Sequence, residues 1–271
     1  MAKPGQRDRV VRANGRGAVK APGGTAIEIS EAEGLRLLRF GTHWCQGAMR
    51  IDDPDRLELE YAVRMCAWLL FHDPGRLAGQ HLVTLGLGAG SLTRFAHRVL
   101  GMQATAVEID ARVIAACRTH FLLPPDGHGL TVLHADAADF IAQAAPGRSI
   151  DVLQVDAYDA SVDKPALDGE AFYAGCRAAL REDGTVAVNL VGRALDVRAS
   201  VARLRAGLQP RAIWQFPPTR AGNVVVIAPC GDIPPEEVLA ARARAIEERW
   251  GLPAPGWLAM ARRTPGRQAA T

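Results

Sequence analysis

The sequence predicts an α/β fold in which helices cover both faces of a mostly parallel sheet, with a small β-hairpin region before it. Two observations predict this arrangement. From residue 81 onward, short apolar runs alternate with segments of helical periodicity, and strands and helices that alternate at this spacing form parallel sheets. Before residue 54, the apolar residues fall in short runs joined by a polar turn, which is typical of antiparallel strands.

The length of 271 residues suits one large domain with small additions. Both ends of the chain are rich in Gly, Pro and basic residues, a composition that buries too little apolar surface to fold alone. We therefore expect four parts: a disordered basic tail (1–25), a small β region (26–54), a Rossmann-like domain (55–250) and a loose C-terminal tail (251–271).

The N-terminal β region is predicted to contain three strands. Residues 26–30 and 35–40 form a hairpin, and residues 44–51 form a third short strand. The sequence Asp52-Asp-Pro-Asp55 then predicts the start of a helix, because acids and an early proline suit the positive end of a helix.

The main domain is predicted from its alternating periodicity. Five apolar runs are expected to be the strands of the parallel sheet, at 81–87, 103–107, 130–134, 151–155 and 185–190. Helical periodicity separates them, at 91–100, 111–120, 137–144 and 169–181. Two further strands are expected to form an antiparallel pair at the sheet edge, followed by a helix, at 211–216, 223–228 and 234–250.

Composition excludes several classes of protein. The longest apolar run, residues 65–71, is too short to cross a bilayer, and the N-terminus lacks the apolar core of a signal peptide, so we expect a cytoplasmic protein that does not bind a membrane. The formal net charge is +3, but residues 1–20 hold six Lys or Arg and one Asp, so the remaining chain is slightly acidic, which argues against a nucleic-acid partner. Five scattered cysteines without a C-x-x-C pair predict reduced thiols and no metal site.

A glycine-rich turn follows the first strand of the main domain. Gly86, Gly88 and Gly90 are separated by single residues, and Ser91 stands where the dinucleotide fingerprint G-x-G-x-x-G has its third glycine. In an open parallel sheet, ligands bind outside the carboxyl ends of the strands. The spacing therefore predicts a nucleotide-type ligand without a pyrophosphate.

Acidic residues follow the next strands. Glu108 suits the two hydroxyls of a ribose, and Asp136, beside the small Ala137, suits an adenine amino group. Asp156 and Asp159 follow the fourth strand. Clustered carboxylates repel one another unless a cation lies among them, so the pattern predicts a positively charged adenosine derivative, such as a sulfonium nucleoside.

Simpler interpretations remain open at two of these positions. Asp136 could equally be a helix N-cap, because aspartate is among the preferred residues there. Asp156 and Asp159 could cap the segment that follows them.

Three motifs resemble the spermidine synthase family, the polyamine aminopropyltransferases with a methyltransferase-type Rossmann fold. The motifs are 85–90, 106–110 and 151–159, and the resemblance extends over residues 26 to 230. It implies a transferase that moves an aminopropyl group from decarboxylated S-adenosylmethionine to a small diamine such as putrescine. It also implies that no prosthetic group is needed and that the protein is a homodimer.

The resemblance assigns roles to individual residues. Asp156 would accept the proton of the attacking amine, and Asp159 would hold that amine in line. Gln46 and Tyr61 would line the donor pocket. Tyr158, between the two acids, could line the acceptor pocket.

The sequence departs from the family pattern at several positions. Ala89 replaces the acid of the glycine loop that meets the donor amine, and Ala62 and Val63 follow the tyrosine in place of His or Gln and Glu. The acceptor segment reads 217–223 Pro-Pro-Thr-Arg-Ala-Gly-Asn and lacks the family's tyrosine. Two alternatives therefore stay open: methyl transfer from S-adenosylmethionine, and nucleoside binding without catalysis.

Overall fold

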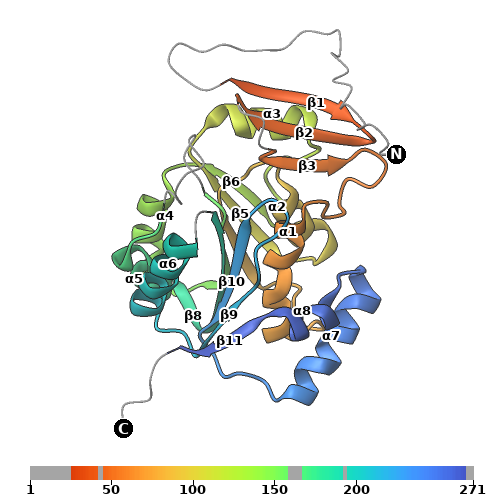
Figure 1. Ribbon diagram of the computed structural model, residues 1–271. Coiled ribbons are helices and arrows are strands. Elements are labelled where there is room, and N and C mark those ends of the chain that lie inside the picture. Colours follow the sequence, from red (N-terminus) through yellow and green to blue (C-terminus); the bar gives the residue numbers. More distant parts are fainter. Residues whose placement is uncertain (1–25, 42–44, 158–166, 192–193, 267–271) are drawn as a thin grey trace, which may run out of the picture.

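The computed structural model describes residues 26–41, 45–157, 167–191 and 194–266, which form two sheets (Figure 1). The smaller sheet is antiparallel, with β2 between β1 and β3, and its strands are β1 (Ile27–Ala32), β2 (Leu35–Phe40) and β3 (Gly47–Arg50). It lies at one end of the large sheet, above β5 and β6 in Figure 1. The predicted N-terminal β region is therefore present as a separate layer.

The large sheet has eight strands in the order β11-β9-β10-β8-β7-β4-β5-β6. The five strands from β8 to β6 run parallel, and β10, β9 and β11 add antiparallel strands beyond β8. Its strands are β4 (His81–Leu85), β5 (Gln103–Glu108), β6 (Leu130–His134), β7 (Ile150–Val155), β8 (Leu180–Val191), β9 (Ala212–Gln215), β10 (Asn223–Pro229) and β11 (Arg262–Pro265). The predicted mixed but mostly parallel α/β sheet is confirmed.

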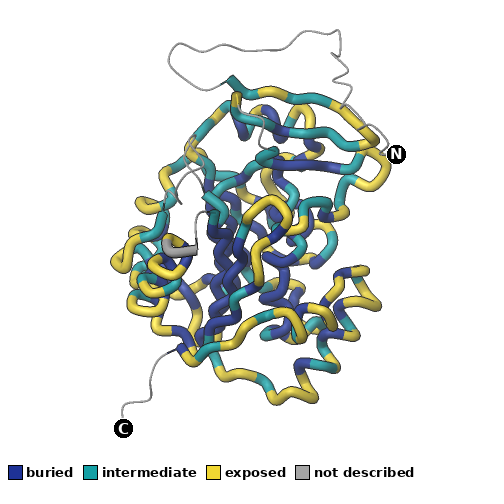
Figure 2. Tube along the Cα trace, viewed as in Figure 1, coloured by how far each residue is buried: buried dark blue, intermediate teal, exposed yellow. Residues whose placement is uncertain are grey.

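Helices cover both faces of the large sheet. One face is covered by α4 (Ala137–Ala144), η3 (Ala145–Gly147), α5 (Glu170–Ala179) and α6 (Ala194–Leu208). The other is covered by α1 (Glu60–Met65), the 3-10 helix η1 (Cys66–Phe71), α2 (Ser91–Arg94), the π-helix η2 (Phe95–Val99), α3 (Ala111–His120), α7 (Glu236–Trp250) and α8 (Ala254–Met260). Figure 2 shows the central strands buried along their length, which explains their nearly continuous apolar sequences.

The predicted helix start at Asp52 to Asp55 is wrong, because α1 begins only at Glu60. Two of the three acids of this segment pair with arginines instead of helix N–H groups. Asp52 accepts from Arg50 at 2.9 Å, and Asp55 lies 3.6 Å from the Nε of Arg94. The segment is therefore tied to its neighbours in a non-helical conformation.

The segment after residue 251 is not a loose tail through residue 266, and α6 was not among the predicted helices. α8 buries Trp257, which is 1% exposed, and β11 pairs with β9, so β9 and β10 are not the outermost strands. Arg263 lies over the ring of Trp214 at 4.1 Å, which holds this strand against the domain. Among the described residues, no helix is both long and apolar enough to span a membrane.

Candidate active site

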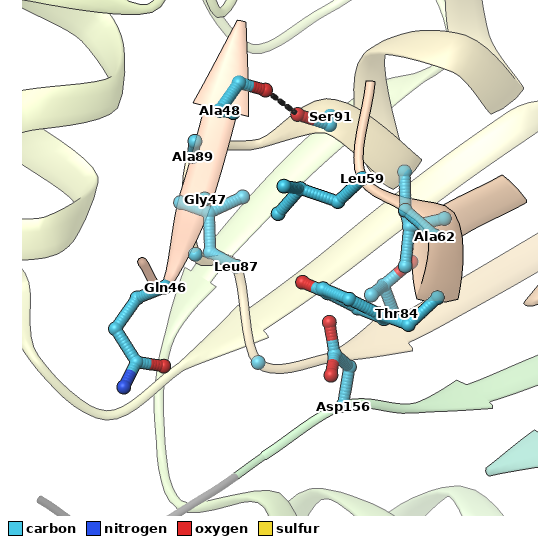
Figure 3. Close-up of a pocket in the computed structure, with 14 residues that line it drawn as sticks. Gln46, Gly47, Ala48, Leu59, Ala62, Thr84, Leu87, Ala89, Ser91 and Asp156 are labelled. Carbon is cyan, nitrogen blue, oxygen red and sulfur yellow. Dashed lines mark hydrogen bonds between the residues drawn. The ribbon is translucent and has the colours of Figure 1, made fainter. Parts of the chain in front are cut away.

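A pocket lies where the small sheet meets the carboxyl ends of β4 and β7 (Figure 3). Four parts of the chain line it: the start of β3, the helix α1 with the residue before it, the stretch from the end of β4 through the glycine loop into α2, and the residue after β7. Of the described lining residues, only Asp156 carries a formal charge. The lining residues are Gln46, Gly47, Ala48, Leu59, Tyr61, Ala62, Thr84, Gly86, Leu87, Gly88, Ala89, Ser91, Leu92 and Asp156.

The glycine loop approaches the end of β7 closely. Gly86 has a φ of 90°, and a Cβ at this position would lie 2.4 Å from the carbonyl oxygen of Asp156. Only glycine avoids both the strained backbone and the clash. The loop is thereby seated beside Asp156, with Gly90, in the left-handed conformation, leading into α2.

The small sheet presses on the other side of this loop. A Cβ on Gly47 would lie 2.5 Å from the Cβ of Ala89, so strand β3 lies directly against the loop. The Ser91 hydroxyl donates to the Ala48 carbonyl at 3.0 Å, a bond drawn in Figure 3. Ala89 is only 3% exposed and belongs to a small apolar cluster with Leu38, Met49 and Phe121. Its methyl group thus packs the sheet onto the loop.

Two buried side chains support the carbonyl groups of the glycine loop. Arg94 donates to the carbonyl oxygens of Ala89 at 3.0 Å and Phe121 at 2.7 Å, and the Cys117 thiol donates to that of Gly88 at 2.9 Å. Burial lowers the pKa of Arg94 and raises that of Cys117 to about 12. Sequence analysis missed both residues; a charged residue among the apolar positions of the predicted helix 91–100 was the available signal.

Glu108 ends β5 beside the glycine loop. One carboxylate oxygen accepts from the backbone N–H of Leu87 at 2.9 Å, and the other accepts from that of Asp110 at 2.9 Å. Burial raises its pKa, and hydrogen bonds from the backbone N–H groups of Leu87, Asp110 and Ile109 oppose the rise. Glu108 therefore shapes the loop, and these donors do not use all of the lone pairs of its carboxylate.

Asp136 is the N-cap of α4. Its Oδ1 accepts from the backbone N–H groups of Ala138 at 2.7 Å and Asp139 at 3.2 Å, so the N-cap interpretation left open above is confirmed for this oxygen. Asp136 is exposed, and Ala137 is partly buried. Neither residue lines the pocket, although both follow the strand next to β5.

Asp156 follows β7 and points its carboxylate into the pocket (Figure 3). Burial raises its pKa to about 6, while hydrogen bonds from Asn189 and Tyr61 oppose the rise. The Asn189 amide donates to Oδ1 of Asp156 at 2.8 Å. This arrangement gives a carboxyl group that titrates close to neutrality and lies beside the glycine loop. Such a group can accept a proton from a bound cation.

The structure brings some of the predicted site residues together and separates others. Gln46, Tyr61, Gly86, Gly88 and Asp156 share the pocket. Glu108, Asp136 and Ala137 lie at neighbouring strand ends outside its lining, because β7, β4, β5 and β6 are adjacent in the sheet. Gly90 leads into α2 from the loop.

Some predictions fall outside the described residues or concern metals. Tyr158 and Asp159 lie outside the described residues. Within the described part of the chain, no cluster of three or more His, Cys, Asp or Glu side chains is placed to hold a metal ion.

Comparisons with known proteins point in one direction. No family model matches the sequence. A polyamine aminopropyltransferase of Chromobacterium violaceum is 33% identical over 229 residues, which are 83% of this chain and 85% of the relative.

Solved structures extend the comparison to the fold. A probable spermidine synthase from Corynebacterium glutamicum has a TM-score of 0.71 at 18% identity, over 92% of this chain and 90% of that one. Human methyltransferase-like protein 13, solved in complex with SAH, has a TM-score of 0.64 at 24% identity, over 72% of this chain and 93% of that one. These two likenesses confirm the predicted methyltransferase-type fold.

Proposed function

Because the chain belongs to the polyamine aminopropyltransferase family and is a transferase, we propose that it moves an aminopropyl group from decarboxylated S-adenosylmethionine to a small diamine such as putrescine. One observation supports this most directly. A carboxyl group with a pKa of about 6, Asp156, points into a pocket beside a glycine loop that is shaped by a second, partly buried carboxylate, Glu108.

Asp156 is proposed as the proton acceptor. A diamine is cationic in water, and its nitrogen must lose a proton before its lone pair can attack. The proton moves to Asp156, and the nitrogen then bonds to the methylene carbon beside the sulfonium sulfur. The carbon–sulfur bond breaks, its electron pair goes to sulfur, and neutral methylthioadenosine leaves. Burial of the carboxylate strengthens its attraction for the incoming cation, which helps to position it.

The donor nucleoside is proposed to lie along the neighbouring strand ends. The lone pairs of Glu108 that the backbone does not use can accept from the ribose hydroxyls. The second oxygen of Asp136 can accept from the adenine amino group, beside Ala137. Gln46 and Tyr61 would contact the sulfonium arm, because both line the pocket with Asp156. Asp159 and Tyr158 are proposed for the acceptor amine.

Methyl transfer from S-adenosylmethionine is a second candidate, and Ala89 favours it. The methyl group of Ala89 packs against Gly47 and Leu38, so the loop offers no carboxylate to bind the amine of the donor or to repel its carboxylate. A site of this kind is less able to select the decarboxylated donor.

Product analysis separates these possibilities. The purified protein is incubated with putrescine and either donor, and the products are identified by mass spectrometry. Spermidine and methylthioadenosine from the decarboxylated donor support aminopropyl transfer. A methylated amine and S-adenosylhomocysteine from S-adenosylmethionine would overturn it in favour of methyl transfer. Binding of both donors without turnover over a panel of diamines would indicate a nucleoside-binding protein.

Two properties of the intact protein complete the proposal. We expect a homodimer by analogy with the family, and a cytoplasmic location. Analytical ultracentrifugation of the full chain tests the first, and fractionation of the producing cell tests the second. A monomer at micromolar concentration would contradict the first.

A further inference from the structure

A chain of hydrogen bonds leads from the turn between β9 and β10 to Asp156. The Asn189 amide donates to Asp156 at 2.8 Å, and the Asn223 amide donates to the side-chain oxygen of Asn189 at 3.0 Å. The Thr219 hydroxyl donates to the side-chain oxygen of Asn223 at 3.3 Å. Thr219, Asn223 and Asn189 are called the polar chain below. Asn189 is 3% exposed and Thr219 is 6% exposed, so solvent has little access to its two ends.

The far end of the polar chain favours one direction for its hydrogen bonds. The backbone N–H of Asn223 can only donate, and it donates to the Thr219 oxygen at 3.0 Å. The Thr219 hydroxyl then has its proton available for the Asn223 oxygen. A reversed Asn223 amide could still donate to the second lone pair of the Thr219 oxygen, but the Thr219 hydroxyl proton would then lose its acceptor. The hydroxyl therefore favours the arrangement in which the Asn223 nitrogen faces Asn189 and the Asn189 nitrogen faces Asp156.

We propose that Thr219 and Asn223 are positioning residues, which fix the Asn189 amide so that it presents N–H, and not its carbonyl oxygen, to the Asp156 carboxylate. The proposal rests on the proposed role of Asp156 as proton acceptor. Neither residue reaches Asp156 itself; each acts through Asn189. An N–H donor favours the ionised acid, whereas an amide oxygen would favour the protonated acid. The polar chain therefore keeps the base ready to accept a proton despite its burial.

Reversal of the two amides is the alternative that Thr219 opposes. If both amides turned over, the Asn189 oxygen would face Asp156, and this is acceptable only when Asp156 carries a proton. The Thr219 hydroxyl would then lose the Asn223 oxygen as its acceptor. Because the hydroxyl is buried, that loss carries a cost. Thr219 thus favours the orientation in which the Asn189 amide presents its N–H to Asp156, which lies three hydrogen bonds away along the polar chain.

Few other groups act on the Asp156 carboxyl from the elements around it. From α1, Tyr61 donates a hydrogen bond, while Glu60 and Arg64 form an ion pair with each other at 2.5 Å. The glycine loop presents backbone at Gly86. From the turn, the backbone N–H of Arg220 donates to Glu60 at 3.2 Å. Among the described residues, Asn189 and Tyr61 are thus the side chains that oppose the effect of burial on Asp156.

The test compares Thr219→Val, which removes the hydroxyl at nearly constant volume, with Thr219→Ser, which keeps it. Ala221→Ser, in the same turn but outside the polar chain, is the matched control. The pKa of Asp156 is measured by ¹³C NMR of protein labelled at aspartate carboxyl carbons, with the resonance assigned by its loss in Asp156→Asn. The pH dependence of kcat/KM for aminopropyl transfer is measured alongside. Thermal unfolding and donor KM report general damage.

Thr219→Val is expected to raise the pKa of Asp156, and the acidic limb of kcat/KM, by about one pH unit. Thr219→Ser and Ala221→Ser should leave both in place. The proposal is overturned if folded Thr219→Val keeps the wild-type pKa, or if Thr219→Ser shifts it equally. Loss of kcat/KM at every pH without a shift would also overturn it, because that indicates only a structural role. If the wild-type protein transfers no aminopropyl group, the proposed function fails, and the NMR titration still decides the orientation of the polar chain.

Discussion

Arg94 offers the most direct test of how the glycine loop is supported. Its side chain is 1% exposed and donates to three carbonyl oxygens, those of Ala89, Phe121 and Pro54, and its Nε lies 3.6 Å from Asp55. Arg94→Met keeps the length of the side chain and removes every donor. The three carbonyl groups, which belong to different segments, would lose their common partner.

The expected cost follows from these contacts. Each buried acceptor left without a partner costs about 1–3 kcal/mol, and Asp55 is partly exposed and can be solvated by water. We expect Arg94→Met to lower the free energy of unfolding by about 3–5 kcal/mol. Arg98→Met is the matched control, since Arg98 lies 3.4 Å from the same Asp55 but is 41% exposed. It should cost less than about 1 kcal/mol.

Urea denaturation followed by tryptophan fluorescence measures both variants. Arg94→Met should shift the midpoint strongly with little change in the slope, and it should weaken donor binding in calorimetry because the loop loses its support. A cost within about 1 kcal/mol of the Arg98→Met value would refute the reasoning, since burial and hydrogen bonding would then not distinguish the two arginines.

Three further variants test other features. Asp156→Asn should abolish aminopropyl transfer, while calorimetry should still detect binding of the donor. In the wild-type protein, kcat/KM should fall as the pH drops through about 6, because the base becomes protonated. Aminopropyl transfer by the variant would contradict the proposed base. Burial lowers the pKa of His72 to about 4, so between pH 6.5 and 4 its proton binds mainly to the unfolded chain. From pH 6.5 to 5, this group alone should lower the free energy of unfolding by about 2 kcal/mol, while the raised pKa of Asp156 acts in the opposite direction. His72→Gln should make this loss smaller, as measured by urea denaturation at both pH values, and an equal loss would contradict the assignment. Gly86→Ala should lower the free energy of unfolding by about 2–4 kcal/mol in the same assay. Gly79→Ala should cost less, because its φ of 84° is similar but its Cβ would meet nothing within 4 Å. Equal costs would show that the contact with Asp156 does not contribute to the cost at Gly86.

The sequence predicted the site best where candidate site residues lie at the ends of strands that its periodicity identifies. Buried strands alternate with helices, so the strand order along the chain placed the glycine turn, Glu108, Asp136 and Asp156 at one edge of the sheet. Because each of these residues lies at or just after the carboxyl end of a strand, its position depended on secondary structure alone. The same reasoning could not decide which acids line a pocket, because that depends on how the small sheet covers the strand ends.

Other features depend on contacts between distant parts of the chain. The polar chain joins Asp156, Asn189 and Thr219, and no local pattern relates their positions. The helix start was wrong because Asp55 pairs with Arg94, a contact between residues far apart in sequence. Local propensity gives way to tertiary contacts in such places.

The contact between Gly47 and Ala89 limits how the donor preference of this protein can evolve. A larger residue at 89 would meet the backbone of β3, and a side chain at 47 would meet the loop, so neither position can change freely while the other stays small. Placing an acid at position 89 would require a change that moves β3 outward. Under the proposed function, selectivity for the arm of the donor depends on how β3 lies against the loop, and we expect strong epistasis between positions 47 and 89 in a deep mutational scan.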